Sequence, residues 1–347
     1  MATLILCYHH IDYGERIDPE TFEQNIVTLI KKGFHPITLT EMCRYIRRGE
    51  DPPYKSVHIT FDDGYADNYF YAYPILKKYG FFATIFVIAS RVASSIKRAT
   101  SEELASLGIT QEKEQLLEKS PYVSWEELDE MVKSGIFEVG SHSLTHSACF
   151  ASKRIVKFND TGNIEWLYRL TGDKRLGIPI YEKKWDCATL CLQDDKNFRD
   201  FLAEFVSENG GKLFFKDKKK AYRTLYKLCK YYLKHYPVEF KQEDELTRFE
   251  RMKKEICGSK VLIEEKLNRH VDFFCYPWGD YDILSVNEVR KCYKAAVTLD
   301  VGLNDGGTYP YLLKRVEVRG GDWLEKRLKI YSSPFLTSLY AKVYHKL

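Results

Sequence analysis

Residues 57–64 read Val57-His-Ile-Thr-Phe-Asp-Asp-Gly64, a short apolar run that ends in two adjacent carboxylates and a glycine. The run Val57–Phe61 has the length of a buried strand. Comparable runs at Leu4–Tyr8, Ala83–Ile88 and Phe137–Gly140 alternate with amphipathic helical patterns that stop at glycines. Strands that alternate with helices in this way predict a parallel α/β sheet, either open or closed into a barrel.

The βα pattern is interrupted between residues 151 and 250 and returns at about Arg251. Residues 151–173 are polar and are expected to be irregular, whereas residues 212–241 are rich in Lys, Tyr and Phe. We therefore expect one βα domain built from residues 1–150 and 251–322. An insertion subdomain would occupy residues 151–250, and a basic, aromatic tail would occupy residues 323–347.

The composition of the 347 residues is that of an ordinary globular protein, with 44% hydrophobic and 29% charged residues. This excludes a disordered chain, a collagen-like repeat and a disulfide-rich mini-protein. The net charge of +4 does not indicate a nucleic-acid partner. The nine cysteines are scattered, and the N-terminus resembles a buried strand rather than a signal peptide. We expect free thiols and a cytoplasmic location.

The two carboxylates Asp62 and Asp63 form the first candidate site. Adjacent acids at the end of a strand are costly unless a cation or a proton separates their charges. Because side chains alternate in direction along a strand, one acid could bind a metal while the other acts as a base. The alternative is a solvated turn, since Asp-Asp-Gly is a common turn sequence.

A pair of histidines, His142 and His146, follows the strand Phe137–Gly140 and forms the second candidate site. An H-x3-H pair on one helical turn can present two imidazoles on one face, as zinc ligands require. Together with Asp63 it gives three protein ligands and leaves one position for water, the arrangement of a catalytic site. The alternative is a pair of surface or capping histidines.

The segment Phe273-Phe-Cys-Tyr-Pro-Trp-Gly279 forms the third candidate site. A strand that meets proline and then glycine makes a sharp turn, and the exposed backbone N–H groups of such a turn can stabilise an oxyanion. The alternative is an ordinary turn at the end of a strand.

Taken together, these segments resemble the polysaccharide deacetylases, the NodB-homology carbohydrate esterases. The matching motifs are Ile59-Thr-Phe-Asp-Asp-Gly64, Glu138-Val-Gly-Ser-His-Ser-Leu-Thr-His146 and Phe274-Cys-Tyr-Pro-Trp-Gly279. The resemblance implies an α/β fold, a distorted (β/α) barrel, here with an inserted helical or irregular subdomain. It also implies a metal-dependent hydrolase that removes N-acetyl groups from the amino sugars of a polysaccharide or glycan precursor.

The resemblance also assigns roles to individual residues. Asp62 resembles the general base, and the backbone N–H of Trp278 would help to hold the oxyanion. Tyr276 and Pro277 would contact the substrate. The implied ligands of a divalent metal, zinc in the first place, are Asp63, His142 and His146.

The sequence departs from the family pattern in two places. Many members have an arginine that orients the base at the position of Cys275, and many carry a catalytic-acid histidine in a late Leu-x-His motif. The late segment here reads Leu312-Leu-Lys-Arg-Val316 and contains no histidine. One branch, which includes the poly-N-acetylglucosamine deacetylases, takes the acid from an N-terminal Tyr-His motif instead. By this resemblance we assign the acid to His9, with His10 as the second choice.

Two rival functions remain open: a catalytically silent carbohydrate-binding protein with the same fold, and an O-deacetylase or deformylase on a lipid-linked sugar. The expected partner is an N-acetylated glycan or its precursor. The basic, aromatic residues of the insertion and tail also suit contact with an anionic membrane on its cytoplasmic face. The alternative is that they form solvated basic helices packed on the protein.

Overall fold

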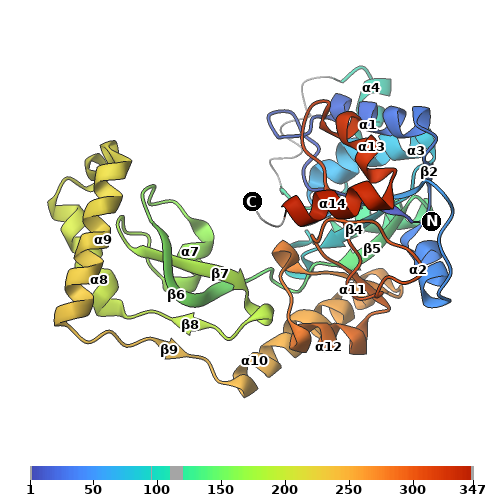
Figure 1. Ribbon diagram of the computed structural model, residues 1–347. Coiled ribbons are helices and arrows are strands. Elements are labelled where there is room, and N and C mark those ends of the chain that lie inside the picture. Colours follow the sequence, from blue (N-terminus) through green and yellow to red (C-terminus); the bar gives the residue numbers. More distant parts are fainter. Residues whose placement is uncertain (1, 95, 110–119, 345–347) are drawn as a thin grey trace. The chain divides into compact units, whose positions relative to one another are not determined.

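A computed structural model describes residues 2–94, 96–109 and 120–344 of the chain (Figure 1). The chain forms two compact units. Unit 1 comprises residues 1–146, 253–279 and 286–347, and unit 2 comprises residues 147–252 and 280–285. The tail helices α13 (Trp323–Tyr331) and α14 (Pro334–Tyr344) belong to unit 1.

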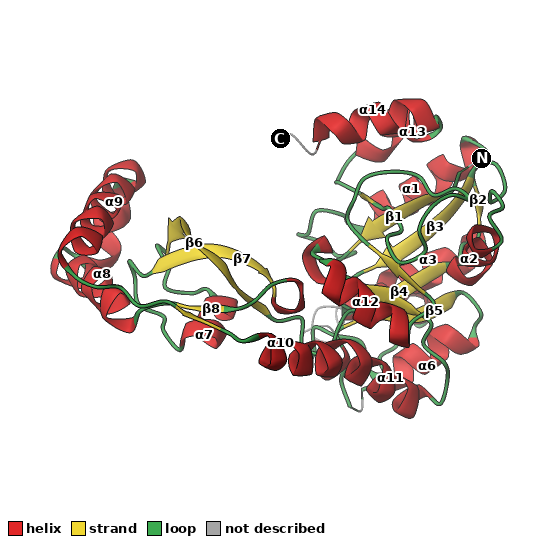
Figure 2. Cartoon of the chain, turned by 60° about the horizontal axis from the view of Figure 1, so that its bottom comes forward, coloured by secondary structure: helices red, strands yellow, loops and turns green. Residues whose placement is uncertain are grey.

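Unit 1 is built on a parallel sheet with the strand order β11-β10-β5-β4-β3-β1-β12, and β2 pairs with the start of β3 (Figure 2). The strands are β1 (Leu4–Tyr8), β2 (His35–Pro36), β3 (Ser56–Phe61), β4 (Ala83–Val87), β5 (Phe137–Ser141), β10 (Phe273–Cys275), β11 (Ala295–Val297) and β12 (Val316–Glu317). Every pairing between them is parallel. The sheet curls into a partial barrel, so the predicted distorted (β/α) barrel is confirmed.

Helices between the strands cover the sheet. They are α1 (Pro19–Lys31), α2 (Leu39–Arg47), η1 (Asn68–Ala72), α3 (Tyr73–Tyr79), η2 (Ala89–Arg91), α4 (Ser101–Ser106), α6 (Trp125–Lys133), η5 (Lys253–Gly258), α11 (Ser259–Leu267), η6 (Pro277–Gly279) and α12 (Ile283–Cys292). Local sequence fixes several ends. The side chain of Asp18 accepts from the Thr21 N–H at the start of α1, and Ser124 with Glu127 forms a capping box at the start of α6.

Unit 2 contains an antiparallel sheet of order β7-β6-β8-β9, flanked by helices. Its elements are β6 (Ala148–Phe158), α7 (Glu165–Thr171), β7 (Pro179–Trp185), η3 (Asp186–Ala188), β8 (Leu192–Gln193), α8 (Lys196–Glu208), η4 (Gly211–Lys216), α9 (Lys218–His235), β9 (Lys241–Gln242) and α10 (Glu245–Met252). Helices α8 and α9 lie side by side and pack their apolar faces around Phe198, Leu202 and Leu225 (Figure 1).

The expectation of an irregular segment at residues 151–173 is wrong. Residues 148–158 form the eleven-residue strand β6, which pairs with β7 from Ala148↔Trp185 to Phe158↔Pro179. The middle of β6 is solvent-facing and polar, and its register shifts twice against β7. It therefore lacks the alternation of apolar residues by which a half-buried strand is recognised.

The expectation of free thiols throughout the chain is also wrong. Cys149 forms a disulfide with Cys191 in unit 2, and Cys257 forms one with Cys292 in unit 1. Each pair is far apart in sequence, so spacing alone could not reveal it. Disulfides persist mainly in oxidising compartments. The cytoplasmic location expected from the sequence stays a prediction. Within the described part of the chain, no helix is long and apolar enough to span a membrane.

Candidate active site

The predicted site residues of unit 1 gather at one edge of the sheet, where parallel strands end. Asp62 and Asp63 follow β3, His142 follows β5, His9 follows β1 and Trp278 follows β10. The pairing Tyr8↔Phe61 aligns the ends of β1 and β3, and the pairing Val87↔Ser141 aligns the ends of β4 and β5. The carboxyl ends of barrel strands are the usual place for catalytic groups.

Asp63, His142 and His146 form a compact ligand cluster. The Nε2 atoms of His142 and His146 lie 3.7 and 3.6 Å from Oδ1 of Asp63, and one ligand atom of each residue lies within 4.8 Å of the others. Ligands about 2.0–2.2 Å from a tetrahedral zinc ion would lie roughly 3.4 Å apart. The cluster therefore has the size and the donor set that a divalent metal needs.

Both histidines are held in the neutral form that can bind a metal. Burial lowers the pKa of His142 to about 4 and that of His146 to about 3, although Asp62 and Asp63 respectively oppose this. Nδ1 of His142 lies 2.9 Å from the carbonyl oxygen of Cys275. If Nδ1 donates to that carbonyl, Nε2 is left with its lone pair toward Asp63.

Arg315 holds the predicted base, Asp62, and was missed by sequence reasoning. Its Nη1 and Nη2 donate to the two carboxylate oxygens of Asp62 at 2.7 and 2.8 Å, and both side chains are buried. Nε of Arg315 donates to the Thr298 carbonyl at 2.8 Å. The orienting arginine absent at Cys275 is thus replaced by one that precedes β12.

Two thiols complete the surroundings of Asp62. Sγ of Cys7 and Sγ of Cys275 each lie 3.5 Å from Oδ2 of Asp62. Cys275 therefore packs beside the ion pair, and Nη2 of Arg315 lies 3.0 Å from its sulfur. Burial alone would raise the pKa of Asp62, but the charge of Arg315 and its hydrogen bonds hold that pKa well below its usual value. Asp62 is therefore a carboxylate at neutral pH.

The two N-terminal histidines face different neighbours. One ligand atom each of His9, Cys7 and Asp62 lies within 4.8 Å of the others, so the His9 imidazole is beside the base. Both histidines line a cavity of about 240 Å³ whose other walls include Arg16.

The imidazole of His10 lies 2.5 Å from Asp67 and stacks on the ring of Tyr65 at 3.5 Å. Burial opposes protonation of His10, but the hydrogen bond and charge of Asp67 prevail and raise its pKa. His10 thus has a carboxylate partner of its own.

The turn at Pro277–Gly279 places Trp278 over the ligand cluster, with its ring 4.2 Å from that of His146. Trp278 has φ of +55°, an unusual conformation for a residue with a side chain. Gly279 has φ of +72°, and a Cβ there would lie 2.7 Å from Cβ of Leu299, so glycine is required.

The predicted substrate contacts of Tyr276 and Pro277 need correction, because both residues are buried. The Tyr276 hydroxyl donates to the Tyr311 carbonyl at 3.2 Å. These side chains shape the turn from inside the fold and present no surface to a ligand.

Sequence reasoning missed Arg315 because its partner, Asp62, is 253 residues away. The available signal in the sequence was only that an arginine directly precedes the short strand β12 (Val316–Glu317). Asp67 was missed because it lies in a polar helix start and is brought to His10 only by the fold.

Comparison with known proteins finds similarity over part of the chain. Residues 49–174 match the polysaccharide deacetylase family. This segment is similar to that family. It contains the Asp62-Asp63 pair and both metal-ligand candidates His142 and His146, and the remaining candidates lie outside it.

Two curated relatives are similar to the chain over part of their length. A putative polysaccharide deacetylase of Bacillus subtilis is 39% identical over 110 residues, which cover 30% of this chain and 39% of that protein. A poly-β-1,6-N-acetyl-D-glucosamine N-deacetylase of Staphylococcus aureus is 32% identical over 127 residues, which cover 37% of each. The chain thus matches well under half the length of these relatives.

Solved structures share the fold over most of the chain. A de-N-acetylase from Aggregatibacter actinomycetemcomitans superposes with a TM-score of 0.60 at 14% identity and covers 94% of this chain and 99% of that one. A Streptococcus pyogenes deacetylase in complex with acetate superposes with a TM-score of 0.56 at 18% identity, with coverages of 96% and 99%. At these identities the likeness establishes the fold.

Proposed function

We propose that this protein is a metal-dependent carbohydrate de-N-acetylase that acts on an N-acetylated polysaccharide or glycan precursor. The observation that carries the proposal is the pairing of two sites at one edge of the sheet. The cluster Asp63, His142 and His146 has the donors and spacing of an open metal site, and the Asp62–Arg315 pair provides an ionised base beside it.

A divalent cation at this cluster would supply Lewis-acid polarisation of the acetyl carbonyl and activation of a water molecule. Asp62 accepts the proton of the attacking water through an oxygen whose orientation Arg315 fixes. The backbone N–H of Trp278 donates to the oxyanion that develops on the carbonyl oxygen. The imidazolium of His9 protonates the departing amine nitrogen, because an unprotonated amine is a poor leaving group.

The substrate class follows from the relatives. The Staphylococcus aureus relative is named for poly-β-1,6-N-acetyl-D-glucosamine, and we infer a related N-acetylhexosamine polymer as the substrate here. The alternative of a lipid-linked or nucleotide-linked precursor uses the same reacting group. The precursor differs from the polymer only in the chemical groups attached around the N-acetylated sugar.

The proposal predicts that the purified chain releases free amines from β-1,6-linked N-acetylglucosamine oligomers. Chelation with dipicolinate should abolish the release and added zinc should restore it, because three ligands leave the metal exchangeable. Amine release is measured with fluorescamine, and bound metal is measured by mass spectrometry.

Three outcomes would favour the rival functions. Saturable oligomer binding without amine or acetate release would identify a catalytically silent carbohydrate-binding protein. Acetate release from O-acetylated sugars, with none from N-acetylated ones, would identify an O-deacetylase. Formate release from a formylated sugar would identify a deformylase.

We also propose that α14 contacts an anionic membrane, because several of its large apolar side chains are exposed. Phe335, Leu336, Leu339 and Val343 are 43–76% exposed, whereas Thr337 is 1% exposed. The Thr337 hydroxyl donates to the carbonyl of Ile330 at 2.9 Å, so this side chain faces the protein while the apolar ones face solvent. The exposed Lys329 and Lys342 provide charges that suit acidic lipid headgroups.

Flotation with vesicles of phosphatidylcholine and phosphatidylserine at low salt tests this contact. The wild-type chain should float, and the Phe335→Ser/Leu339→Ser variant should remain at the bottom of the gradient. Ile30→Ser is the matched control, since Ile30 on α1 is also exposed, at 44%. Failure of the wild-type chain to float would remove the membrane proposal and leave the catalytic one intact.

A further inference from the structure

The loop that carries the second histidine is strained at both ends. Ser143 has φ of +65° and His146 has φ of +54°, and neither is glycine. A residue with a side chain in the left-handed region costs about 1–2 kcal/mol. Such a conformation persists only where the surrounding structure over-determines it. The two residues between these ends, Leu144 and Thr145, are therefore where a restraint should be found.

Glu255 supplies that restraint. Its backbone carbonyl accepts from the Leu144 N–H at 3.0 Å. Its carboxylate accepts from the Thr145 N–H at 2.9 Å through Oε2 and from the Thr145 hydroxyl at 2.8 Å through Oε1. Glu255 is buried, so water does not compete strongly for these bonds. Three hydrogen bonds to one residue thus fix Leu144 and Thr145, the two residues that precede His146.

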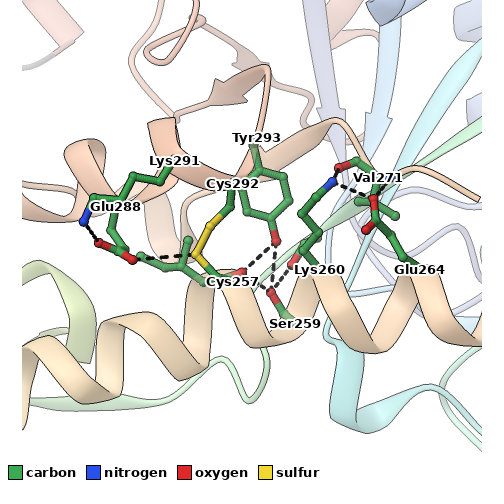
Figure 3. Close-up of a disulfide and its surroundings, with 11 residues drawn as sticks. Cys257, Ser259, Lys260, Glu264, Val271, Glu288, Lys291, Cys292 and Tyr293 are labelled. Atoms are coloured by element: carbon green, nitrogen blue, oxygen red, sulfur yellow. Dashed lines mark hydrogen bonds and ion pairs between the residues drawn. A yellow bond between two sulfur atoms is a disulfide. The ribbon is translucent and has the colours of Figure 1, made fainter.

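The segment that carries Glu255 is anchored independently of the loop. It is the π-helical turn η5, a local geometry that occurs frequently at functional sites. Within it, the Ile256 carbonyl accepts from the Tyr293 hydroxyl at 2.8 Å, and Cys257 is bonded to Cys292 (Figure 3). Ser259, directly after it, contacts Ser141 at 2.7 Å between the two hydroxyl oxygens.

Through these contacts, η5 and the residue after it bind the residue that precedes each of the two metal-ligand histidines. Ser141 precedes His142 in the chain, and Thr145 precedes His146. We propose that Glu255 is a positioning residue that holds His146 in the geometry for metal binding. The inference rests on the proposed function, since it assumes that Asp63, His142 and His146 bind a divalent metal. Without the carboxylate, the loop can relieve its left-handed conformations, and Nε2 of His146 moves away from Asp63.

Zinc affinity of the purified full chain, measured by competition with a chromophoric chelator, tests the proposal. Glu255→Ala should raise the Kd for zinc about 10–100-fold, the usual effect of losing a residue that orients a metal ligand. The Kd of Glu255→Gln for zinc should stay close to that of the wild type. The amide oxygen of the glutamine can accept from the Thr145 N–H, and its NH2 can donate to the Thr145 hydroxyl. Thr145→Val loses one of the two hydrogen bonds to the carboxylate. Its Kd for zinc should lie between those of Glu255→Ala and Glu255→Gln.

Glu288→Ala is the matched control. Glu288 is buried as deeply as Glu255 and contacts Cys257 and Lys291, with no hydrogen bond to the histidine loop among those of the described residues. Its replacement should lower the melting temperature and leave zinc affinity unchanged. If Glu255→Ala fails to fold, Thr145→Val carries the test alone.

The outcomes separate this inference from the proposed function. Wild-type zinc binding combined with equal binding by Glu255→Ala and Thr145→Val would overturn the role of Glu255 and leave the metal site standing. A wild-type chain that binds no divalent metal would overturn both. Loss of affinity in Glu255→Ala with recovery in Glu255→Gln would support positioning rather than a general loss of structure.

Discussion

Replacing Arg315 with leucine should lower kcat/KM for de-N-acetylation by about 10²–10⁴-fold, the usual contribution of general acid–base catalysis. The reason is that Asp62 loses both its bidentate partner and the charge that keeps it ionised. Breaking a buried ion pair on one side also destabilises a fold by ~3–5 kcal/mol. Chemical denaturation should show a loss of that order.

The pH dependence distinguishes orientation from simple destabilisation. In the wild-type protein the pKa of Asp62 lies below its unfolded value, so the ion pair contributes stability above a pH of about 4. That contribution is lost as the pH falls through the folded pKa. In Arg315→Leu, burial raises the pKa of Asp62 without opposition. Since the base must be ionised, the acidic limb of kcat/KM should move to higher pH.

Arg98→Leu is the matched control for this experiment. Arg98 and Glu127 form a second fully buried ion pair in unit 1, with Nε–Oε1 and Nη2–Oε2 distances of 2.7 Å. Arg98→Leu should lose about as much stability as Arg315→Leu. The acidic limb of its kcat/KM profile should stay at the wild-type pH. Arg315→Lys, which keeps the charge and loses the two-pronged geometry, should retain more activity than Arg315→Leu. A wild-type pH profile in Arg315→Leu would show that Arg315 does not hold the base.

Replacing His9 with alanine should remove most turnover, by about 10²–10⁴-fold, and leave zinc binding unchanged. Its imidazole lies beside Asp62 and outside the ligand cluster of Asp63, His142 and His146. The loss should appear mainly in kcat, because protonation of the leaving amine occurs in the transition state. A substrate with a better leaving group, such as an aryl acetate, should be less affected.

His10→Ala is the internal comparison, because the two imidazoles are neighbours in the chain. His10 is engaged by Asp67 and Tyr65, so its loss should reduce activity less than that of His9. A larger loss in His10→Ala than in His9→Ala would transfer the role of the acid to His10, with Asp67 as the residue that raises its pKa. Near-wild-type turnover in His9→Ala would remove the assignment to His9.

The sequence by itself determined the sheet of unit 1 and the ligand cluster. The apolar runs at Leu4–Tyr8 and Val57–Phe61 are buried on both faces in the structure, as parallel strands are, so they stand out without tertiary information. Asp63, His142 and His146 were recognisable because each motif lies next to the strand that positions it. Local periodicity and capping residues suffice for features of this kind.

Only the tertiary structure decided what holds these groups. Arg315 reaches Asp62, Glu255 reaches Thr145, and Cys257 reaches Cys292 across 253, 110 and 35 residues. Such partners are brought together by the closing of the sheet and the packing of η5, and neither leaves a local pattern. Strand β6 was missed for the same reason, since its pairing with β7, rather than an alternation of apolar residues, makes it a strand.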